Sequence, residues 1–319
     1  MSPSAAAIKT ITFPDRDLLE AVGPLPAGIR GAVWDFAAAP DGLDVADVDG
    51  VVLPYLNAGA VLGALSRAGN LKFVQAQTTG VDGIREAVGD GVAIASAAGV
   101  HAASTAELAV GLVLASLRGI DTAVRDQLEG RWRHERRASL ADRRVLLVGV
   151  GGIGAEIAKR LLPFEVELTR VGTQARDDDE GHVHGADELV QLAGATDVMI
   201  VITPLTDATR GLINAEVLAA LPDGALVVNV ARGAVVDSDA LTAEVVSGRL
   251  KCAIDVFDPE PIPADHPLWK AENALITPHV GGDTSAFEPR IVRLLQRQLE
   301  ALSNGNEPQN LVHPGRIWG

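Results

Sequence analysis

The sequence predicts an α/β protein with parallel sheets covered by helices, and a doubly wound domain in its second part. Two observations predict this class. Short β-rich runs alternate with helical patterns along the whole chain, which is typical of parallel sheets with helices on their faces. In addition, a glycine-rich turn, Gly149-Val150-Gly151-Gly152-Ile153-Gly154, directly follows an apolar run and directly precedes an amphipathic one.

The glycine-rich turn has the strand–turn–helix context of a dinucleotide-binding fingerprint. Its strand is expected at 145–148 and its helix at 155–162. In such a fingerprint Gly149 permits the tight turn, Gly151 lets the backbone approach the pyrophosphate, and Gly154 lets helix and strand pack closely. The helix N-terminus adds aimed N–H groups and a positive dipole. This context favours a dinucleotide site over an ordinary strand–helix turn.

The first third of the chain already alternates between strand and helix patterns. Helices are expected over 15–22 and 57–68, and a long helix from about Ala102 to Asp126. Strands are expected at five short runs, namely 8–13, 32–36, 51–54, 72–77 and 92–95.

The second alternating set begins at Val145 and fits a doubly wound dinucleotide domain, because six strands follow in order. A further helix is expected at 285–302, and a polar stretch ending in Trp318 follows it. The six strands are expected at 145–148, 166–171, 198–202, 225–230, 250–256 and 274–277.

Length and composition limit the class of protein. A chain of 319 residues exceeds a comfortable single core, so two domains are expected. The net charge of −15 argues against a nucleic-acid partner or an anionic membrane surface. We see no secretory signal, and the apolar stretch 102–117 is interrupted by Glu107 and Ser116, so a cytoplasmic protein without a membrane span is expected. The single cysteine, Cys252, reads as a buried apolar residue, and we predict no metal site.

Three polar residues stand just after predicted strands of the second set. They are Arg232, Glu260 and His279. Because carboxyl ends of parallel strands meet at one edge of a sheet, these side chains are expected to converge. Arg can bind a carboxylate through two hydrogen bonds, His can pass a proton near neutral pH, and a carboxylate beside it favours its protonated form. Taken singly, each residue has an ordinary structural explanation, but together they suit carbonyl reduction over a nicotinamide.

These residues lie within motifs that resemble the D-2-hydroxyacid dehydrogenase family, which includes glyoxylate/hydroxypyruvate reductases and phosphoglycerate dehydrogenases. The motifs run in family order from about residue 50 to residue 282. Besides the glycine fingerprint, they are Thr79-Gly80-Val81-Asp82-Gly83-Ile84, Gly130-Arg131-Trp132, Thr203-Pro204-Leu205-Thr206, Asn229-Val230-Ala231-Arg232-Gly233, Asp255-Val256-Phe257-Asp258-Pro259-Glu260-Pro261 and Thr277-Pro278-His279-Val280-Gly281-Gly282.

The resemblance implies a Rossmann dinucleotide-binding domain, residues 98–282, inserted into a flavodoxin-like substrate domain, residues 1–97 and 283–319. It also implies an NAD(P)-dependent oxidoreductase that acts on a small 2-keto or 2-hydroxy acid in the cleft between the domains. A homodimer, joined through the long helix and the Gly130-Arg131-Trp132 region, is a further implication.

The resemblance assigns roles to individual positions. Arg232 is expected to bind the substrate carboxylate and keto oxygen, His279 to be the acid/base, and Glu260 to be its partner. Substrate contacts are expected from the backbone of Gly80 and Val81 and from Tyr55. The residues expected at the cofactor are Thr105, Gly149, Gly151, Gly152, Ile153, Gly154, Thr173, Arg176, Thr203, Pro204, Val230, Ala231, Asp255 and Gly281.

One departure from the family pattern favours NADP(H) over NAD(H). Relatives that prefer NAD usually carry an Asp at the end of the second strand, where it binds the ribose 2′-OH. Here that position is Gly172, followed by Thr173 and, three residues later, Arg176. A hydroxyl and an Arg suit a 2′-phosphate, so Arg176 is the predicted phosphate ligand. The alternative is that Arg176 only neutralises the acidic run 177–180.

Substrate identity is less constrained by the residues. The loop Pro54-Tyr55-Leu56 is mostly apolar and has no added cation, which disfavours phosphoglycerate and favours a small or moderately apolar 2-keto acid. Formate-oxidising relatives carry Gln where Glu260 stands here. Two alternatives stay open: a phosphoglycerate dehydrogenase-type activity, and a dinucleotide-sensing scaffold that resembles the C-terminal-binding-protein co-repressors.

Overall fold

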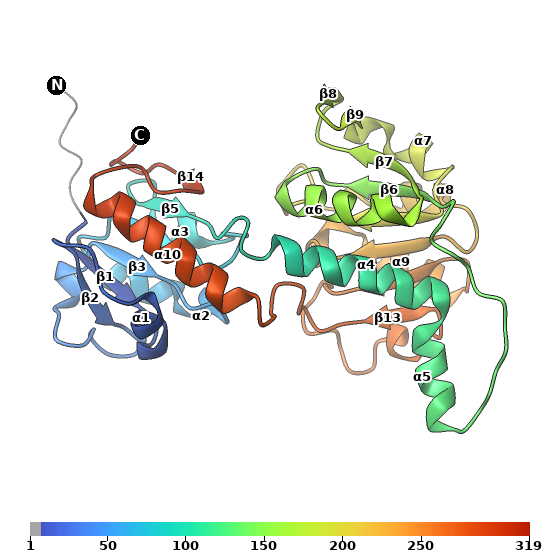
Figure 1. Ribbon diagram of the computed structural model, residues 1–319, viewed down its shortest axis with the longest axis horizontal. Coiled ribbons are helices and arrows are strands. Elements are labelled where there is room, and N and C mark those ends of the chain that lie inside the picture. Colours follow the sequence, from blue (N-terminus) through green and yellow to red (C-terminus); the bar gives the residue numbers. More distant parts are fainter. Residues whose placement is uncertain (1–7) are drawn as a thin grey trace. The chain divides into compact units, whose positions relative to one another are not determined.

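The computed structural model describes residues 8–319, which form two compact units (Figure 1). Within the described chain, the first unit comprises residues 8–101 and 285–319, and the second comprises residues 102–284. The second unit is therefore inserted into the first along the chain. Each unit is a sheet with helices on both faces.

The sheet of the first unit has the flavodoxin-like strand order. Its five parallel strands run β2-β1-β3-β4-β5, and β14 adds to β5 in antiparallel orientation. This arrangement confirms the predicted fold class of the unit. The strands are β1 (Thr10–Phe13), β2 (Arg30–Val33), β3 (Gly50–Val52), β4 (Phe73–Gln75), β5 (Ala93–Ala95) and β14 (Leu311–His313).

Two helix layers cover this sheet. On one face α1 (Arg16–Val22) and α10 (Phe287–Ser303) bury their apolar stripes, and Asp15 caps α1 by accepting a hydrogen bond from the Leu18 N–H at 2.8 Å. The other face is covered by short elements. They are α2 (Ala58–Val61), the 3₁₀ segment η2 (Leu62–Arg67) and α3 (Ile84–Val88), with η1 (Val45–Asp47) before β3.

The sheet of the second unit is doubly wound. Its order is β13-β12-β11-β10-β6-β7-β9-β8, and all neighbours are parallel except the β8–β9 pair. The chain winds outward in both directions from β6, so the switch point lies between β6 and β10. The strands are β6 (Arg144–Val148), β7 (Glu167–Val171), β8 (Arg176–Asp178), β9 (Gly181–His184), β10 (Val198–Val201), β11 (Leu226–Asn229), β12 (Lys251–Ile254) and β13 (Ala274–Ile276).

Alternate residues of these strands enter two different cores. Leu147, Ile200 and Val228 pack toward α4 (Ala102–Arg118) and α6 (Gly152–Leu161) on one face. Their strand neighbours face the opposite layer, where Asn214 and Asp237 cap two of the helices. That layer holds α7 (Leu189–Ala193), α8 (Ala215–Ala220), α9 (Ser238–Val246) and η6 (Pro267–Lys270); the remaining 3₁₀ turns are η3 (Leu162–Phe164), η4 (Ala186–Glu188) and η5 (Gly233–Val235).

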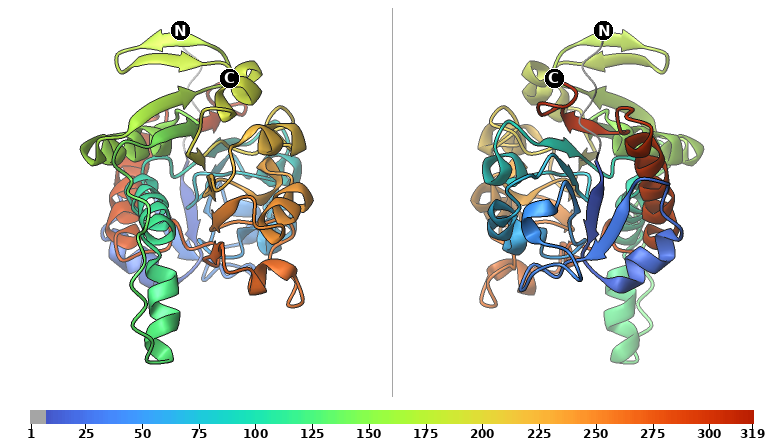
Figure 2. Two further views of the ribbon diagram at one scale, coloured as in Figure 1. Left: turned by 90° about the vertical axis from the view of Figure 1, so that its right-hand side faces the viewer. Right: turned by 90° about the vertical axis from the view of Figure 1, so that its left-hand side faces the viewer.

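The structure corrects two sequence predictions about strands. The strand expected at 32–36 is β2, which ends at Val33. It could not have included Phe36, whose positive φ of 67° does not fit a strand. The second set has eight strands rather than six, since β8 and β9 form an edge hairpin, visible beside β7 in Figure 2. The hairpin is mostly polar and only Val183 of β9 is buried, so an apolar pattern could not reveal it. Strand β14, which has only three residues, was also missed.

The long helix predicted over 102–126 is also wrong in part. The chain breaks at Gly119, which has a φ of 63°, and α5 (Ile120–Leu128) continues at an angle of 64° to α4. No single helix among residues 8–319 is long and apolar enough to cross a membrane, and α4 with α5 would satisfy that test only as a bent pair, by length and composition.

Close packing in the glycine-rich turn generates a stability prediction. A Cβ on Gly154 would lie 2.0 Å from the Gly149 carbonyl oxygen, whereas a Cβ on Gly152 meets nothing within 4 Å. We expect Gly154→Ala to lower the free energy of unfolding by more than about 2 kcal/mol, because the strand–helix turn must open. The matched Gly152→Ala variant should change it by less than about 0.5 kcal/mol. Urea denaturation followed by circular dichroism tests this, and equal effects of both changes would contradict it.

Candidate active site

The three predicted catalytic residues follow three adjacent strands. β11, β12 and β13 are parallel neighbours, so their carboxyl ends share one edge of the sheet. Arg232 follows β11, Glu260 lies in the loop after β12, and His279 follows β13. This edge is where open α/β sheets place their chemistry.

Glu260 and His279 are in direct contact. The Nδ1 atom of His279 lies 2.7 Å from Oε2 of Glu260, and both side chains are partly exposed, at 48% and 38%. The other carboxylate oxygen of Glu260 accepts a hydrogen bond from the Phe257 N–H at 3.1 Å, which fixes the carboxylate against its own loop. Because Nδ1 is engaged, Nε2 is the ring atom that remains for a substrate.

The two residues shift each other's pKa: that of His279 is raised and that of Glu260 is lowered, which favours a protonated His beside a carboxylate. The hydrogen bond that Glu260 accepts from His279 is the largest reason that the pKa of His279 is raised. The charges of Glu260 and Asp255 add to it, while burial and the Arg232 charge oppose it. Burial alone would raise the pKa of Glu260. Hydrogen bonds from His279 and from the Phe257 N–H, with the charges of His279 and Arg232, together hold that pKa below its usual value.

The buried carboxylate of Asp255 holds the His279 loop in place. Its Oδ1 accepts hydrogen bonds from the Thr277 hydroxyl at 2.5 Å and the Val280 N–H at 2.9 Å, and its Oδ2 accepts one from the Gly281 N–H at 2.8 Å. The Asp255 carbonyl also accepts a hydrogen bond from the His279 N–H at 2.8 Å. His279 is thereby kept at a φ of 54°, a conformation uncommon for a residue other than glycine.

Arg232 is positioned by the turn that ends β11. The buried Asn229 side chain accepts a hydrogen bond from the Ala231 N–H at 3.0 Å and donates one to the Arg232 carbonyl at 3.1 Å. The next residue, Gly233, packs so closely on the following loop that a Cβ there would lie 2.0 Å from the Phe257 backbone. This contact brings the Arg232 turn against the loop that carries Glu260.

The glycine-rich turn fits a dinucleotide. Gly149 has a φ of 118° and lies against Ile202 and Thr203 after β10, while Gly151 and Gly152 leave open space where a Cβ would be. The buried hydroxyl of Thr203 has no hydrogen-bond partner in residues 8–319, which makes it a free group at the switch point. The N-terminus of α6 begins here, so the turn combines a backbone cradle with aimed N–H groups.

Other predicted cofactor residues lie around this edge of the second unit. Thr105 is buried in α4 and would be 3.4 Å from a Cβ on Gly281, which places it beside the Asp255 carboxylate. Val230 and Ala231 form the turn after β11, and Pro204 follows Thr203, where its carbonyl accepts a hydrogen bond from Thr209 at 2.6 Å. Ile153 lies in the first turn of α6.

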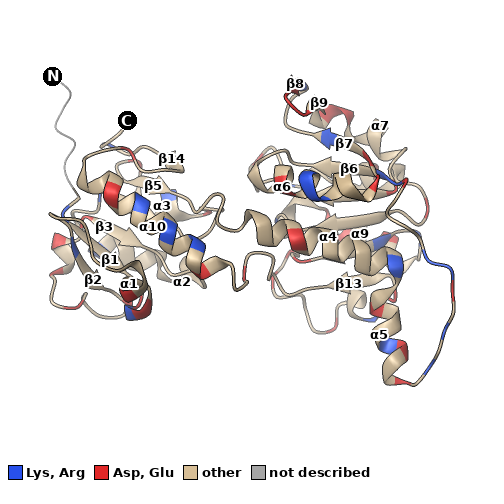
Figure 3. Ribbon diagram, in the orientation of Figure 1, with Lys and Arg blue, Asp and Glu red and all other residues tan. Residues whose placement is uncertain are grey.

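The predicted 2′-phosphate residues follow β7. The Gly172 N–H donates to the His184 carbonyl at 2.9 Å, and Thr173 and Arg176 are exposed. A Cβ on Gly172 would lie 3.0 Å from the Arg176 guanidinium, so this Arg reaches back to the carboxyl end of β7. At the acidic end of the β8–β9 hairpin, red in Figure 3, Asp178 and Glu180 form ion pairs with Arg170, at 2.6 Å for Asp178. The hydrogen bond from Arg170, and also the charge of Arg176, lower the pKa of Asp178.

The predicted substrate residues belong to the first unit. Gly80 and Val81 lie in the loop after β4, where the Thr78 hydroxyl donates to the Gly80 carbonyl at 2.6 Å. Tyr55 follows β3 and stacks on the Phe287 ring, with 4.1 Å between the ring centroids. The contact of these residues with a substrate stays a prediction.

Sequence reasoning did not single out two residues that shape the site. Asn229 shapes the Arg232 turn, and Thr277 donates to Asp255. One signal could have found Asn229: it is a polar residue at the end of an otherwise apolar run, and such residues are buried only when hydrogen-bonded.

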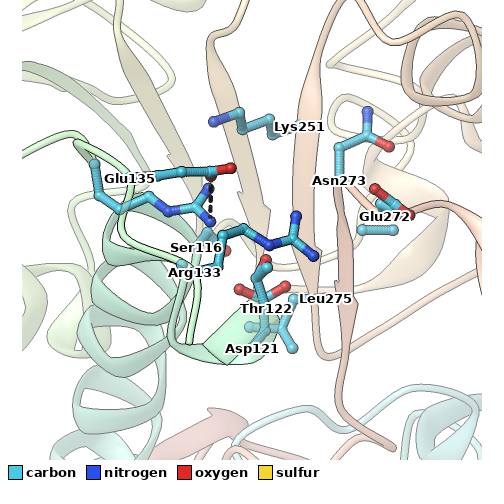
Figure 4. Close-up of a pocket in the computed structure, with 12 residues that line it drawn as sticks. Ser116, Asp121, Thr122, Arg133, Glu135, Lys251, Glu272, Asn273 and Leu275 are labelled. Carbon is cyan, nitrogen blue, oxygen red and sulfur yellow. Dashed lines mark ion pairs between the residues drawn. The ribbon is translucent and has the colours of Figure 1, made fainter. Parts of the chain in front are cut away.

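A polar cavity of about 300 Å³ lies at the opposite edge of the same sheet (Figure 4). It is lined by Lys251 and Ala274, the first residues of β12 and β13, and by residues of α5 and the segment that follows it. Because the candidate catalytic residues follow the carboxyl ends of these strands, this cavity is separate from their site.

Comparison with known proteins agrees with this geometry. A family model described as D-isomer specific 2-hydroxyacid dehydrogenase, NAD binding domain, matches residues 110–281. The hydroxypyruvate reductase of Thermotoga maritima is 35% identical over 261 residues, which cover 79% of this chain and 84% of that protein.

Two solved structures extend the likeness to nearly the whole chain. A D-isomer specific 2-hydroxyacid dehydrogenase from Xanthobacter autotrophicus Py2, solved with NADPH and MES, is 30% identical with a TM-score of 0.80, covering 98% of this chain and 100% of that one. An NADPH-dependent glyoxylate/hydroxypyruvate reductase from Sinorhizobium meliloti, solved with NADP and malonate, is 27% identical with a TM-score of 0.80, covering 98% of both chains. The chain therefore belongs to the D-isomer specific 2-hydroxyacid dehydrogenases, NAD(P)-dependent oxidoreductases that act on the CH–OH group of their donors.

Proposed function

We propose that this enzyme interconverts a small 2-keto acid, glyoxylate or hydroxypyruvate, and its 2-hydroxy acid, with NADP(H) as the preferred cofactor. The observation that carries the proposal is the hydrogen-bonded His279–Glu260 pair, which shares one edge of the sheet with Arg232. The names of the Thermotoga maritima and Sinorhizobium meliloti relatives support these two acids as substrates.

The residues divide the work of reduction in a simple way. Arg232 binds the substrate carboxylate and its keto oxygen through the planar guanidinium, which also fixes the orientation of C2. His279, protonated with Glu260 at Nδ1, gives its Nε2 proton to the keto oxygen as negative charge develops there. When bound, the reduced nicotinamide supplies the hydride that C2 accepts. His279 is left neutral and regains a proton from solvent.

The remaining expected contacts complete this proposal. Gly80 and Val81 offer backbone N–H groups to the carboxylate, and Tyr55 lies in the loop that selects the rest of the substrate. For the cofactor, Asp255 would contact the nicotinamide carboxamide, and Thr203 and Pro204 would line the adenosine side. Support comes from the open turn at Gly151 and from the unpartnered Thr203 hydroxyl in the described chain.

The first experiment measures oxidation of NADPH and NADH at neutral pH with glyoxylate, hydroxypyruvate, pyruvate, a branched 2-keto acid and phosphohydroxypyruvate. We expect turnover with glyoxylate or hydroxypyruvate and a higher kcat/KM with NADPH. The best turnover with phosphohydroxypyruvate would replace the substrate proposal by a phosphoglycerate-type activity. Tight cofactor binding without turnover of any acid would overturn the enzymatic proposal in favour of a sensing scaffold.

Removing the charge of Glu260 should change the pH profile. Because Glu260 raises the pKa of His279, and reduction needs His279 protonated, kcat/KM for reduction falls as pH rises through that pKa. In Glu260→Gln the pKa of His279 drops, so the fall should begin at least about half a pH unit lower. Stopped-flow or steady-state kinetics from pH 5 to 9 measures this. In the control, His279→Gln, kcat/KM for reduction should be low at every pH. An unshifted pH profile in Glu260→Gln would show that Glu260 does not set the pKa of His279.

The cofactor preference should depend on Arg176. We expect Arg176→Gln to raise KM for NADPH at least about tenfold, since a charge-assisted contact to the 2′-phosphate is lost, and to leave KM for NADH within about twofold. Arg316→Gln, which alters an Arg of the first unit, is the matched control. Equal losses for both cofactors would refute the assignment of Arg176.

The homodimer is part of the same proposal and is supported by exposed apolar side chains. Ile120, Val124 and Leu128 recur every four residues on α5 and are 52%, 53% and 85% exposed, and Trp132 after the helix is 97% exposed. Such a stripe is typical of an interface. We expect Val124→Glu combined with Leu128→Glu to halve the mass measured by light scattering after size exclusion. Val246→Glu, at a similarly exposed site on α9, should not change that mass, and a wild-type monomer would contradict the proposal.

A further inference from the structure

Two histidines and a glutamate cluster on the hairpin edge of the second unit, away from the carboxyl ends of β11, β12 and β13. His182 and His184 alternate along β9, so both rings point to the same face of the strand. Glu188 ends η4, the turn that follows β9, and reaches back to His184. One ligand atom from each of the three lies within 4.8 Å of the other two.

Each histidine already has a carboxylate partner. Nδ1 of His182 lies 2.8 Å from Oδ1 of Asp177 on the neighbouring strand β8, and Nδ1 of His184 lies 2.9 Å from Oε2 of Glu188. The other oxygen of Glu188 accepts a hydrogen bond from the Gly185 N–H at 2.9 Å. The two imidazole rings are nearly perpendicular, with centroids 4.6 Å apart.

We propose that His182, His184 and Glu188 bind one divalent transition-metal ion. The separation of 2.9 Å between His184 Nδ1 and Glu188 Oε2 is the distance that two metal bonds of about 2.1 Å span at a right angle, so an ion can replace the proton that they share. His182 supplies the third bond from the next position on the same face of β9. Asp177 is a positioning residue, because a carboxylate at one ring nitrogen fixes the orientation of a metal-ligating imidazole.

The donor set defines the class of metal. Two imidazoles and one carboxylate suit Zn²⁺, Co²⁺, Ni²⁺ or Cu²⁺, whereas Mg²⁺ and Ca²⁺ prefer oxygen ligands throughout. Both oxygens of the Glu188 carboxylate are already oriented, one by His184 and the other by the Gly185 N–H. The His182 side chain is 51% exposed, which leaves the ion open to water on that side.

The proposed metal site lies next to the carboxyl end of β7, to which the hairpin is joined by a backbone hydrogen bond. The carbonyl of His184 accepts the Gly172 N–H, and β8 begins with Arg176, so an ion bound at these ligands would tie β9 to η4 beside that segment. Binding at this place does not depend on the proposed substrate or cofactor, and it can be measured without any turnover.

Titration of the full-length, EDTA-treated protein with Zn²⁺ by calorimetry and with Co²⁺ by visible absorption tests the proposal. We expect one equivalent of Zn²⁺ at the hairpin, and at least about tenfold weaker binding in His184→Gln and in Glu188→Gln. His134→Gln, on the segment after α5, and His279→Gln, which removes the other His–Glu pair, should keep that equivalent. If His279→Gln abolishes it, or if all four variants bind equally, the assignment is overturned.

A second measurement needs no variant and so does not depend on how the variants fold. Diethyl pyrocarbonate acylates accessible histidines, and mass spectrometry locates the modified residues. With one equivalent of Zn²⁺ we expect modification of His182 and His184 to slow at least about fivefold, while that of His134 stays unchanged. Equal rates at His182 and His184 with and without Zn²⁺ would refute the site.

Discussion

The candidate active site depends on one buried carboxylate. Asp255 directly follows β12 and is only 4% exposed. Burying its carboxylate there without hydrogen-bond partners would cost free energy. Its oxygens accept hydrogen bonds from Thr277, Val280 and Gly281, so the loop after β13 is held onto the end of β12. That loop then has no freedom to place His279 elsewhere, and the strained backbone of His279 directs the ring to Glu260.

A second constraint is the close approach of backbones at glycines. Gly154 lies on the Gly149 carbonyl, and Gly233 lies on the backbone at Phe257. In both places a methyl group would separate two segments that carry function: the fingerprint turn from its helix, and the Arg232 turn from the Glu260 loop. Asp255 and these glycines act in the same direction, because each shortens the distance between loops that follow neighbouring strands. The site is therefore rigid where the proposed chemistry needs orientation.

These constraints explain which parts could be predicted from the sequence. Strands of the second sheet are buried on both faces, so β6, β10, β11 and β12 appear as apolar runs, and the polar residues just after them stand out. The β8–β9 hairpin lies at the edge of the sheet, where exposed backbone groups can bond to water. It therefore needs no apolar face, and its sequence shows no apolar pattern. The break at Gly119 was hidden, since an isolated glycine inside a helical pattern does not reveal its sign of φ. The partners of Asp255 could not be predicted either, because they come from a loop more than 20 residues later.

Charge links the fold to the proposed substrate. The chain carries a net charge of −15, so an anionic acid and an anionic dinucleotide must be bound against the overall field. The candidate site supplies local compensation. The Asp255 carboxylate is satisfied by hydrogen bonds, and in the proposed reaction protonated His279 balances the negative charge of Glu260. In the proposed reaction Arg232 is the cation that binds the carboxylate, and the N-terminus of α6 offers its N–H groups to the phosphates. Transfer of the His279 proton would leave Glu260 with an unmatched charge, and this penalty favours return of the proton from solvent before the next turnover.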